Sequence, residues 1–66
     1  MSVAKIIEIS CTSNKSFEDA IQQGITRAEK TLKGVKSAWV ADQSVEVKDG
    51  KVIEYQTRLK LTFVLE

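Results

Sequence analysis

The sequence predicts an α+β domain with the chain order β-α-β-β, in which a three-stranded antiparallel sheet packs against one helix. Three observations predict this class. Apolar and polar residues alternate through the C-terminal part of the chain, an amphipathic helical pattern occupies its middle, and Asp49-Gly50 separates two segments of strand character. We expect residues 1–66 to form a single domain, because 66 residues are enough for one small core.

The first strand is predicted from Val3 to Cys11, where the residues fit the two faces of a sheet. One face carries Val3, Ile7, Ile9 and Cys11, and the other carries Ala4, Ile6, Glu8 and Ser10. Lys5 interrupts the first face near its start, where a long side chain can reach solvent. The polar residues 12–15 then connect this strand to a helix.

The helix is predicted to begin after Ser16, whose hydroxyl can accept a hydrogen bond from the backbone N–H of Asp19 while the Asp19 side chain reaches back. The apolar positions follow helical spacing and form one stripe: Phe17, Ala20, Ile21, Gly24, Ile25, Ala28 and Leu32. Gly34 is predicted to end the helix in a left-handed conformation. Gly24 lies on the apolar stripe, which predicts a close approach between the helix backbone and the sheet.

The second and third strands are predicted over Val35–Val47 and Val52–Leu65. In the third strand apolar residues occupy odd positions: Ile53, Tyr55, Leu59, Leu61, Phe63 and Leu65. Even positions are polar: Glu54, Gln56, Arg58, Lys60 and Thr62. One face of this strand therefore meets the core and the other is open. A long edge strand would promote aggregation through its unpaired backbone groups, so we place this strand in the centre of the sheet.

The connections fix the strand order. The helix returns the chain, so that the first and second strands run in the same direction, and the hairpin reverses the third strand against both. The predicted order is therefore 1-3-2, with every neighbour antiparallel and the helix on one face.

Two hairpin turns fit the sequence, and they place the side chains of the second strand on opposite faces. A two-residue turn at Asp49-Gly50 puts Val45 and Val47 on the open face. A three-residue turn over residues 48–50 puts both valines on the core face. The apolar character of the two valines favours the three-residue turn.

The choice of turn also decides the neighbours of Gln56. The two-residue turn puts Trp39 and Gln43 on the open face with Gln56, whereas the three-residue turn places Asp42 directly opposite Gln56. With the three-residue turn, Trp39 reaches the open face only if a bulge separates it from Gln43.

The composition argues against several classes of protein. The formal net charge of +1, with both signs interspersed, predicts no binding to nucleic acid or to a membrane surface. No apolar run approaches ~20 residues. Cys11 is the single cysteine and histidine is absent, so an intrachain disulfide and the usual zinc ligand sets are excluded. The unpaired cysteine, and the absence of a signal-peptide pattern at residues 1–3, predict a cytoplasmic protein.

The size of the chain predicts self-association. A lone core is marginal at this length, and small domains commonly gain stability from disulfides, metals or oligomerisation. The first two have no obvious basis in this sequence. We therefore expect copies of the chain to meet through the edge strands or the uncovered sheet face.

Catalytic groups are scarce, so we expect no enzyme. Without histidine there is no Ser-His or Cys-His pair, although the sequence does not exclude a lysine as the catalytic base. A glycine-rich phosphate loop is also missing. Asp42 and Glu46 fit two solvated carboxylates on one strand face better than an acid/base pair. Cys11 fits a small buried hydrophobe better than a nucleophile.

The remaining combination is a set of side chains near a mixed sheet face: Trp39, Gln43, Gln56 and Arg58. Tryptophan offers a flat apolar surface to a stacked ring, and glutamine offers a donor and an acceptor to the edge of a heterocycle. The alternative is that Trp39 is a core or subunit-contact aromatic and that Gln56 is a solvated strand residue.

A series of short motifs covers essentially the whole chain: Val3–Ile9, Thr12-Ser13, Ser16–Ile21, Arg27-Ala28, Trp39, Tyr55-Gln56 and Leu61–Glu66. In this order, and in a chain of this length, they resemble the dodecins, a family of small flavin-binding proteins. The resemblance implies a strand-helix-strand-strand fold that assembles as a hollow homododecamer. It also implies that riboflavin or FMN is stacked in pairs between tryptophans of neighbouring subunits, for storage and buffering and not for turnover.

The resemblance assigns roles to individual residues. Gln56, after Tyr55, matches the family glutamine that addresses the polar ring edge. Asp42 and Glu46 match positions near the polyol chain of the flavin. The predicted cofactor-binding residues are therefore Trp39, Gln56, Asp42, Glu46, Gln43 and Arg58.

The position of Trp39 leaves an alternative open. In an ungapped match, the stacking tryptophan of flavin-binding members falls on Ser37, two residues before Trp39. Either the strand is locally shifted, or Trp39 has another role. The alternative function is a dodecin-like shell that binds coenzyme A or metal ions, or that acts as a scaffold.

Overall fold

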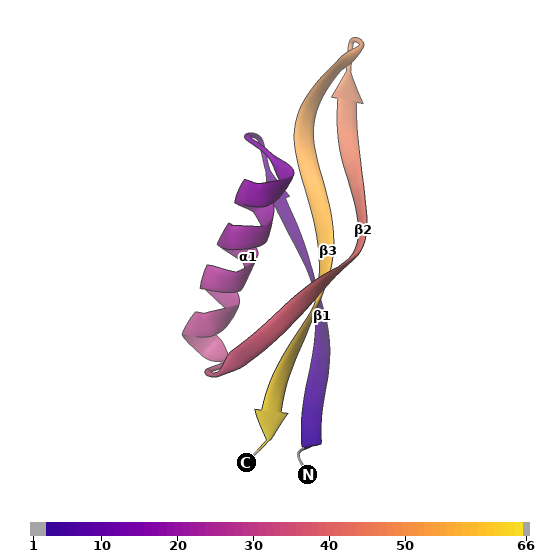
Figure 1. The fold of residues 1–66 in the computed structure, drawn as a ribbon. Helices are drawn as coiled ribbons and strands as arrows, with labels where there is room; N and C mark the ends of the chain where they lie inside the picture. The colour runs from indigo at the N-terminus through magenta and orange to yellow at the C-terminus, as the bar shows by residue number, and fades with distance from the viewer. Residues whose placement is uncertain (1–2, 66) are drawn as a thin grey trace.

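The four predicted elements are all present in the computed structural model, which describes residues 3–65 (Figure 1). They are β1 (Val3–Ser13), α1 (Phe17–Thr31), β2 (Val35–Lys48) and β3 (Lys51–Leu65). Each strand extends one or two residues past its predicted bounds.

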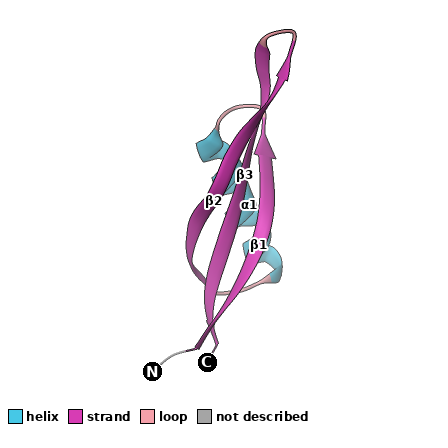
Figure 2. Ribbon diagram, turned by 90° about the vertical axis from the view of Figure 1, so that its right-hand side faces the viewer, coloured by secondary structure: helices cyan, strands magenta, loops and turns pink. Residues whose placement is uncertain are grey.

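The three strands form one antiparallel sheet in the order β1-β3-β2, which confirms the predicted topology. Helix α1 lies against one face of this sheet (Figure 2). No other element of residues 3–65 covers the opposite face, which we call the open face. Its side chains come from the even positions of β1 and β3, as the alternation predicts.

The pairing of β1 with β3 is regular along its whole length. On the helix side Ile9 lies opposite Leu59 and Cys11 opposite Thr57, and on the open face Ser10 lies opposite Arg58. The two faces of this pair therefore differ sharply, with an apolar helix side and a polar open side.

The hairpin turn has two residues, so the three-residue turn that the valines favoured is wrong. Lys48 pairs with Lys51, and Asp49 and Gly50 between them have φ values of 52° and 75°. Two successive residues with positive φ are the requirement of a type I′ turn, whose twist matches that of the flanking strands.

A bulge at Ile53 nevertheless gives the faces that the three-residue turn would have given. The register shifts between the pairs Val47–Val52 and Glu46–Glu54, which leaves Ile53 without a partner on β2. Beyond the bulge Val45 lies opposite Tyr55 on the helix side. The expected pairing of Asp42 with Gln56 is wrong by two residues, because Ser44 lies opposite Gln56 and Asp42 lies opposite Arg58.

A second bulge, at Ala41, brings Trp39 to the open face. The register shifts between the pairs Val40–Leu59 and Asp42–Arg58, so β2 carries one residue more than β3 at this point. Trp39 consequently lies opposite Lys60, on the same face as Asp42. This is the bulge that the sequence required if Trp39 was to reach the open face.

The core is small and lies between α1 and the centre of the sheet. Its buried apolar residues are Cys11, Ala20, Leu59 and Leu61. A β-carbon added to Gly24 would lie 3.2 Å from the β-carbon of Cys11 and would overlap its sulfur. The helix therefore approaches β1 at Gly24, as its place on the apolar stripe predicts.

The helix begins as predicted and its first turn is tied to β1. The Ser16 hydroxyl accepts a hydrogen bond from the backbone N–H of Asp19 at 3.0 Å. The Asp19 carboxylate does not complete the cap at Ser16 but accepts from the Ser13 hydroxyl at 2.6 Å. At the other end Gly34 has a φ of 83°, which confirms the predicted left-handed conformation. The prediction that Gly34 ends the helix is wrong, because α1 ends at Thr31 and its C-cap is Leu32, whose backbone N–H donates to the carbonyl oxygen of Ala28 at 2.7 Å.

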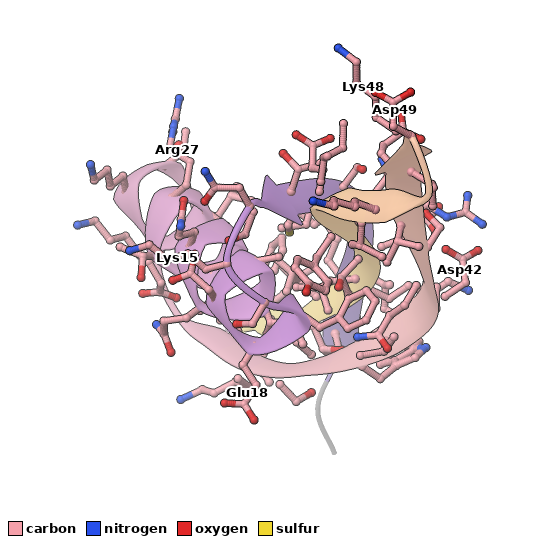
Figure 3. All side chains as sticks on the ribbon, turned by 90° about the horizontal axis from the view of Figure 1, so that it is seen from above. Lys15, Glu18, Arg27, Asp42, Lys48 and Asp49 are labelled. Carbon is pink, nitrogen blue, oxygen red and sulfur yellow. The ribbon has the colours of Figure 1, made fainter. Side chains whose placement is uncertain are left out.

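The molecule is elongated, with dimensions of 51 × 20 × 13 Å. The tip of the β2–β3 hairpin extends beyond the first turn of α1 (Figure 1). In that first turn Phe17 contacts Tyr55 of β3 edge-to-face, with ring centroids 5.1 Å apart. Viewed from above, charged side chains such as Asp42 project outward, away from the space between helix and sheet (Figure 3). The helix in the described range is too short and too polar to cross a membrane.

Candidate functional site

Five of the six predicted site residues lie on the open face of the sheet: Trp39, Asp42, Glu46, Gln56 and Arg58. Gln43 does not join them. Its side-chain amide donates to the hydroxyl of the buried Thr57 at 3.4 Å, on the side that faces the helix. The Ile53 bulge is the reason, because it places the odd residues of this part of β2 on the helix side.

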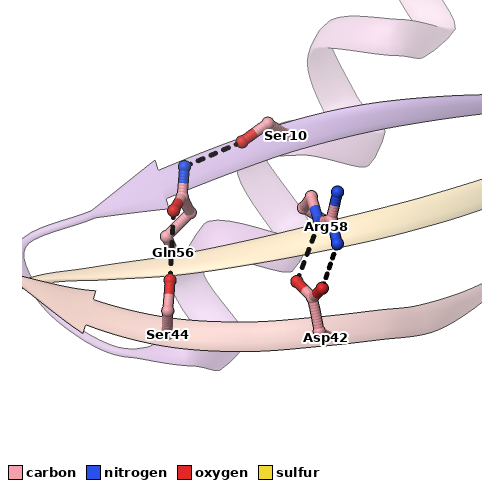
Figure 4. Close-up of polar contacts among 5 residues, drawn as sticks. All are labelled: Ser10, Asp42, Ser44, Gln56 and Arg58. Carbon is pink, nitrogen blue, oxygen red and sulfur yellow. Dashed lines mark hydrogen bonds and ion pairs between the residues drawn. The ribbon is translucent and has the colours of Figure 1, made fainter.

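Gln56 is the centre of a polar ladder that spans all three strands (Figure 4). Its Oε1 accepts from the hydroxyl of Ser44 on β2 at 3.1 Å, and its Nε2 donates to the hydroxyl of Ser10 on β1 at 3.0 Å. The amide is thus held from both neighbouring strands.

Next to this ladder, Arg58 and Asp42 form a bidentate ion pair (Figure 4). Arg58 Nε donates to Asp42 Oδ1 at 2.9 Å, and Arg58 Nη2 donates to Asp42 Oδ2. The hydrogen bond from Arg58 lowers the pKa of the Asp42 carboxyl, and the bond to Asp42, with the charges of Asp42 and Glu8, raises the pKa of Arg58. Both groups therefore stay charged over the physiological pH range.

Trp39 lies further along the same face and leaves 45% of its surface exposed. The Lys60 ammonium lies 5.9 Å from the centre of the indole ring, within the range of a cation–π contact. A large apolar ring with this exposure is a surface on which a second flat ring can stack.

These groups follow one line down the sheet. The rows of Gln56, Arg58 and Lys60 are successive even positions on β3, so the ladder and the Trp39 row are about 13 Å apart at the usual strand rise. The arrangement can bind a planar molecule that stacks on the indole of Trp39 and extends along the face toward the polar side chains of Arg58 and Gln56.

The cysteine thiol is not part of this face. Cys11 is buried on the helix side, and burial raises the pKa of its thiol. A hollow of about 210 Å³ beside it, between α1 and β1, is lined mainly by apolar atoms and contains none of the six predicted site residues. Residues 3–65 hold no group of three or more His, Cys, Asp or Glu side chains arranged around a common point.

Sequence reasoning missed the two serines of the ladder. Ser10 and Ser44 carry no motif. The contact of Ser44 with Gln56 depends on the β2–β3 register that the Ile53 bulge creates, and that of Ser10 depends on the regular pairing of β1 with β3. Only the cross-strand pairing could have identified them. The sequence did not determine that pairing, because it allowed both a two-residue and a three-residue hairpin turn.

The comparisons with known proteins agree on one family. The family model described as Dodecin matches residues 3–66. A curated relative, the calcium dodecin of Mycobacterium tuberculosis, is 33% identical over 63 residues, which covers 96% of this chain and 89% of the relative.

Solved structures show the same similarity. A point mutant of the T. thermophilus dodecin superimposes with a TM-score of 0.93 at 35% identity, covering 100% of this chain and 98% of the other. The dodecin of Streptomyces coelicolor gives a TM-score of 0.92 at 31% identity, covering 98% of this chain and 93% of that one. The family match, the curated relative and the fold together show that this chain belongs to the dodecin family.

Proposed function

We propose that this protein binds a flavin, riboflavin or FMN, in crevices between copies of the chain, and stores it in the cytoplasm without turning it over. The observation that carries the proposal is the exposed indole of Trp39 on the same uncovered face as Gln56. A stacked ring and a polar edge reader are the two elements that recognition of an isoalloxazine needs.

Self-assembly as a homododecamer is part of the proposal, because the open face of a single chain is an uncovered surface that does not enclose a ligand. Large apolar side chains are exposed at both ends of the sheet: Val3 (61%), Ile6 (54%), Val47 (60%), Ile53 (50%) and Leu65 (51%). Exposed apolar residues in this number favour association, and neighbouring copies would close the face into crevices.

The position of Trp39 is compatible with this role. Ser37, on which the stacking tryptophan falls in an ungapped family match, lies opposite Thr62, and Trp39 lies opposite Lys60. The two positions are therefore on the same face, one pleat repeat or about 7 Å apart. A shift of two residues moves the ring along the face and keeps it open to a ligand.

Two carboxylates and one guanidinium would meet the polyol chain of the flavin. Asp42 and Glu46 flank Ser44 on the open face. Arg58 bonds Asp42 through Nε and Nη2, so its Nη1 takes no part in that ion pair. Such groups accept from and donate to hydroxyls, which suits riboflavin and the sugar-like part of FMN.

A cation-binding shell is the second candidate function. The M. tuberculosis relative is named a calcium dodecin. In this chain Glu46 lies directly opposite Glu54 on the open face, and two like charges in this position repel each other unless a cation neutralises them.

Quenching of riboflavin fluorescence tests the first candidate. Titration of the wild-type protein at micromolar concentration is expected to quench the dye, because the indole stacks on it. Trp39→Ala is expected to abolish the quenching, and Lys30→Ala, an exposed change on the helix, is expected to preserve it. A wild-type protein that leaves riboflavin fluorescence unchanged would contradict flavin binding.

Calorimetry with calcium separates the second candidate from the first. A cation shell predicts heat of binding that Glu46→Gln removes and Trp39→Ala leaves in place. The flavin proposal predicts that Trp39→Ala removes the heat of riboflavin binding, whereas Glu46→Gln, which keeps a hydrogen-bond acceptor for the polyol chain, weakens binding without abolishing it.

A further inference from the structure

We propose that Ser10 and Ser44 are positioning residues that hold Gln56 so that its amide reads an imide edge, a ring N–H flanked by carbonyl groups. This inference rests on the proposed binding of a flavin, whose pyrimidine ring carries such an edge. It assigns a role to two residues that the stacking and edge-reading scheme does not otherwise use.

The geometry is a three-strand clamp. Ser10 and Ser44 approach Gln56 from opposite sides, at 3.0 Å and 3.1 Å, through β1 and β2 (Figure 4). Gln56 is half-buried in the central strand, whereas both serines are exposed at the edge strands. The amide is therefore fixed laterally by two short side chains that have little freedom of their own.

The clamp leaves one donor and one acceptor for a ligand. A primary amide has two N–H groups and two oxygen lone pairs. Ser10 takes one N–H and Ser44 takes one lone pair. The remaining N–H and lone pair match a carbonyl and an adjacent ring N–H, which together form the edge of an imide.

Hydroxyl groups on both sides make the clamp tolerant of amide orientation. A serine hydroxyl donates and accepts, so the ladder persists when the amide turns by 180°. Gln56 can therefore pair with the carbonyl on either side of the imide N–H. A ligand without that N–H satisfies only one of the two free positions in either orientation.

The clamp also prepares the side chain for binding. A free glutamine on a strand loses rotamer freedom when a ligand orders it, and this loss weakens binding. Ser10 and Ser44 order the side chain before the ligand arrives, so they act on affinity through Gln56 without touching the ring.

The test compares riboflavin with N3-methylriboflavin, in which a methyl group replaces the imide hydrogen. Both dissociation constants are measured by fluorescence quenching for the wild type, for Ser10→Ala/Ser44→Ala and for Ser10→Thr/Ser44→Thr. The wild type is expected to prefer riboflavin by about tenfold, since one hydrogen bond and one unsatisfied group separate the two ligands. The double alanine variant is expected to lose most of this preference, and the double threonine variant, which keeps both hydroxyls, to retain it.

Four further results interpret the titrations. Gln56→Leu is expected to show no preference between the ligands, because the edge reader is gone. If the double alanine variant loses its assembly, the single Ser44→Ala variant is expected to show an intermediate ratio. An unchanged ratio in correctly assembled alanine variants, with or without a common loss of affinity, would overturn the positioning role while leaving flavin binding intact. A wild type that binds neither ligand would overturn flavin binding itself and this inference with it.

Discussion

At the scale of single residues, Gly24 and Cys11 show how one missing methyl group sets the distance between helix and sheet. The added β-carbon at Gly24 would overlap the Cys11 sulfur, while the sulfur itself is almost fully buried. Alanine normally favours a helix over glycine by about 1 kcal/mol, but overpacking a core costs about 1–3 kcal/mol. The packing term is therefore expected to exceed the propensity term.

Gly24→Ala is accordingly expected to lower the free energy of unfolding, by up to about 2 kcal/mol, which is the difference between the two terms. Urea denaturation at one fixed protein concentration measures the change. The double variant Gly24→Ala/Cys11→Ala removes the colliding sulfur and is expected to recover part of the loss. A Gly24→Ala protein that is more stable than the wild type would show that the helix does not approach β1 this closely.

Asp19 gives the fold a dependence on acid. The hydrogen bond from Ser13, the bond from Gln23 and the charge of Lys15 lower the pKa of its carboxyl. A depressed folded-state pKa contributes stability that is complete above the ordinary carboxyl pKa and is lost as the pH falls through the lower, folded-state value. Asp19 therefore stabilises the protein at neutral pH and ceases to do so in acid.

Asp19→Asn is expected to lower stability at neutral pH and to flatten the decline in stability on acidification. Thermal unfolding measured across the acidic range checks this. Ser13→Ala removes the main cause of the shift and is expected to flatten the decline in the same direction. An Asp19→Asn protein with a decline as steep as that of the wild type would assign the acid sensitivity to other carboxylates.

At the scale of secondary structure, the hairpin reconciles two conflicting signals in the sequence. Asp49-Gly50 favours a two-residue turn, which by itself would put Val45 and Val47 on the open face. The apolar character of these two valines favours the helix side instead. The Ile53 bulge satisfies both, because one extra residue in β3 reverses the faces beyond it.

The turn predicts a specific stability difference. Gly50→Ala is expected to destabilise the protein by about 1 kcal/mol, since alanine at a φ of 75° is strained. Asp49→Asn is expected to be neutral or slightly stabilising, because asparagine adopts positive φ more readily. Denaturation of the two variants side by side makes the comparison, and equal losses would contradict a type I′ turn.

The elements were predictable because each has a local signal. Ser16 and the helical stripe define α1 within its own segment, and alternation defines β3. The register of β2 was not predictable, because a bulge is a balance between unpaired backbone groups at one point and better packing several residues away. The positions of Trp39 and Gln43, and the contact of Ser44 with Gln56, depend on that balance, so five of the six site residues were placed together only by the structure.

At the scale of the whole molecule, the face that carries the candidate site is not covered, and in our proposal one chain supplies only part of a binding site. The helix covers one face of the sheet, and the other carries an exposed indole, an ion pair and the serine-clamped glutamine on a surface without walls. The apolar side chains at both ends of the sheet are suited to contacts with further copies. Assembly and ligand binding are therefore expected to depend on the same surface.

Sedimentation velocity of the purified protein with excess riboflavin, recorded at both protein and flavin absorbance, tests this account most directly. The account predicts that protein and flavin move together at the mass of a homododecamer, and that Trp39→Ala sediments at the same mass without the flavin. A folded wild-type protein that sediments as a 7.4 kDa monomer and carries no flavin would contradict it.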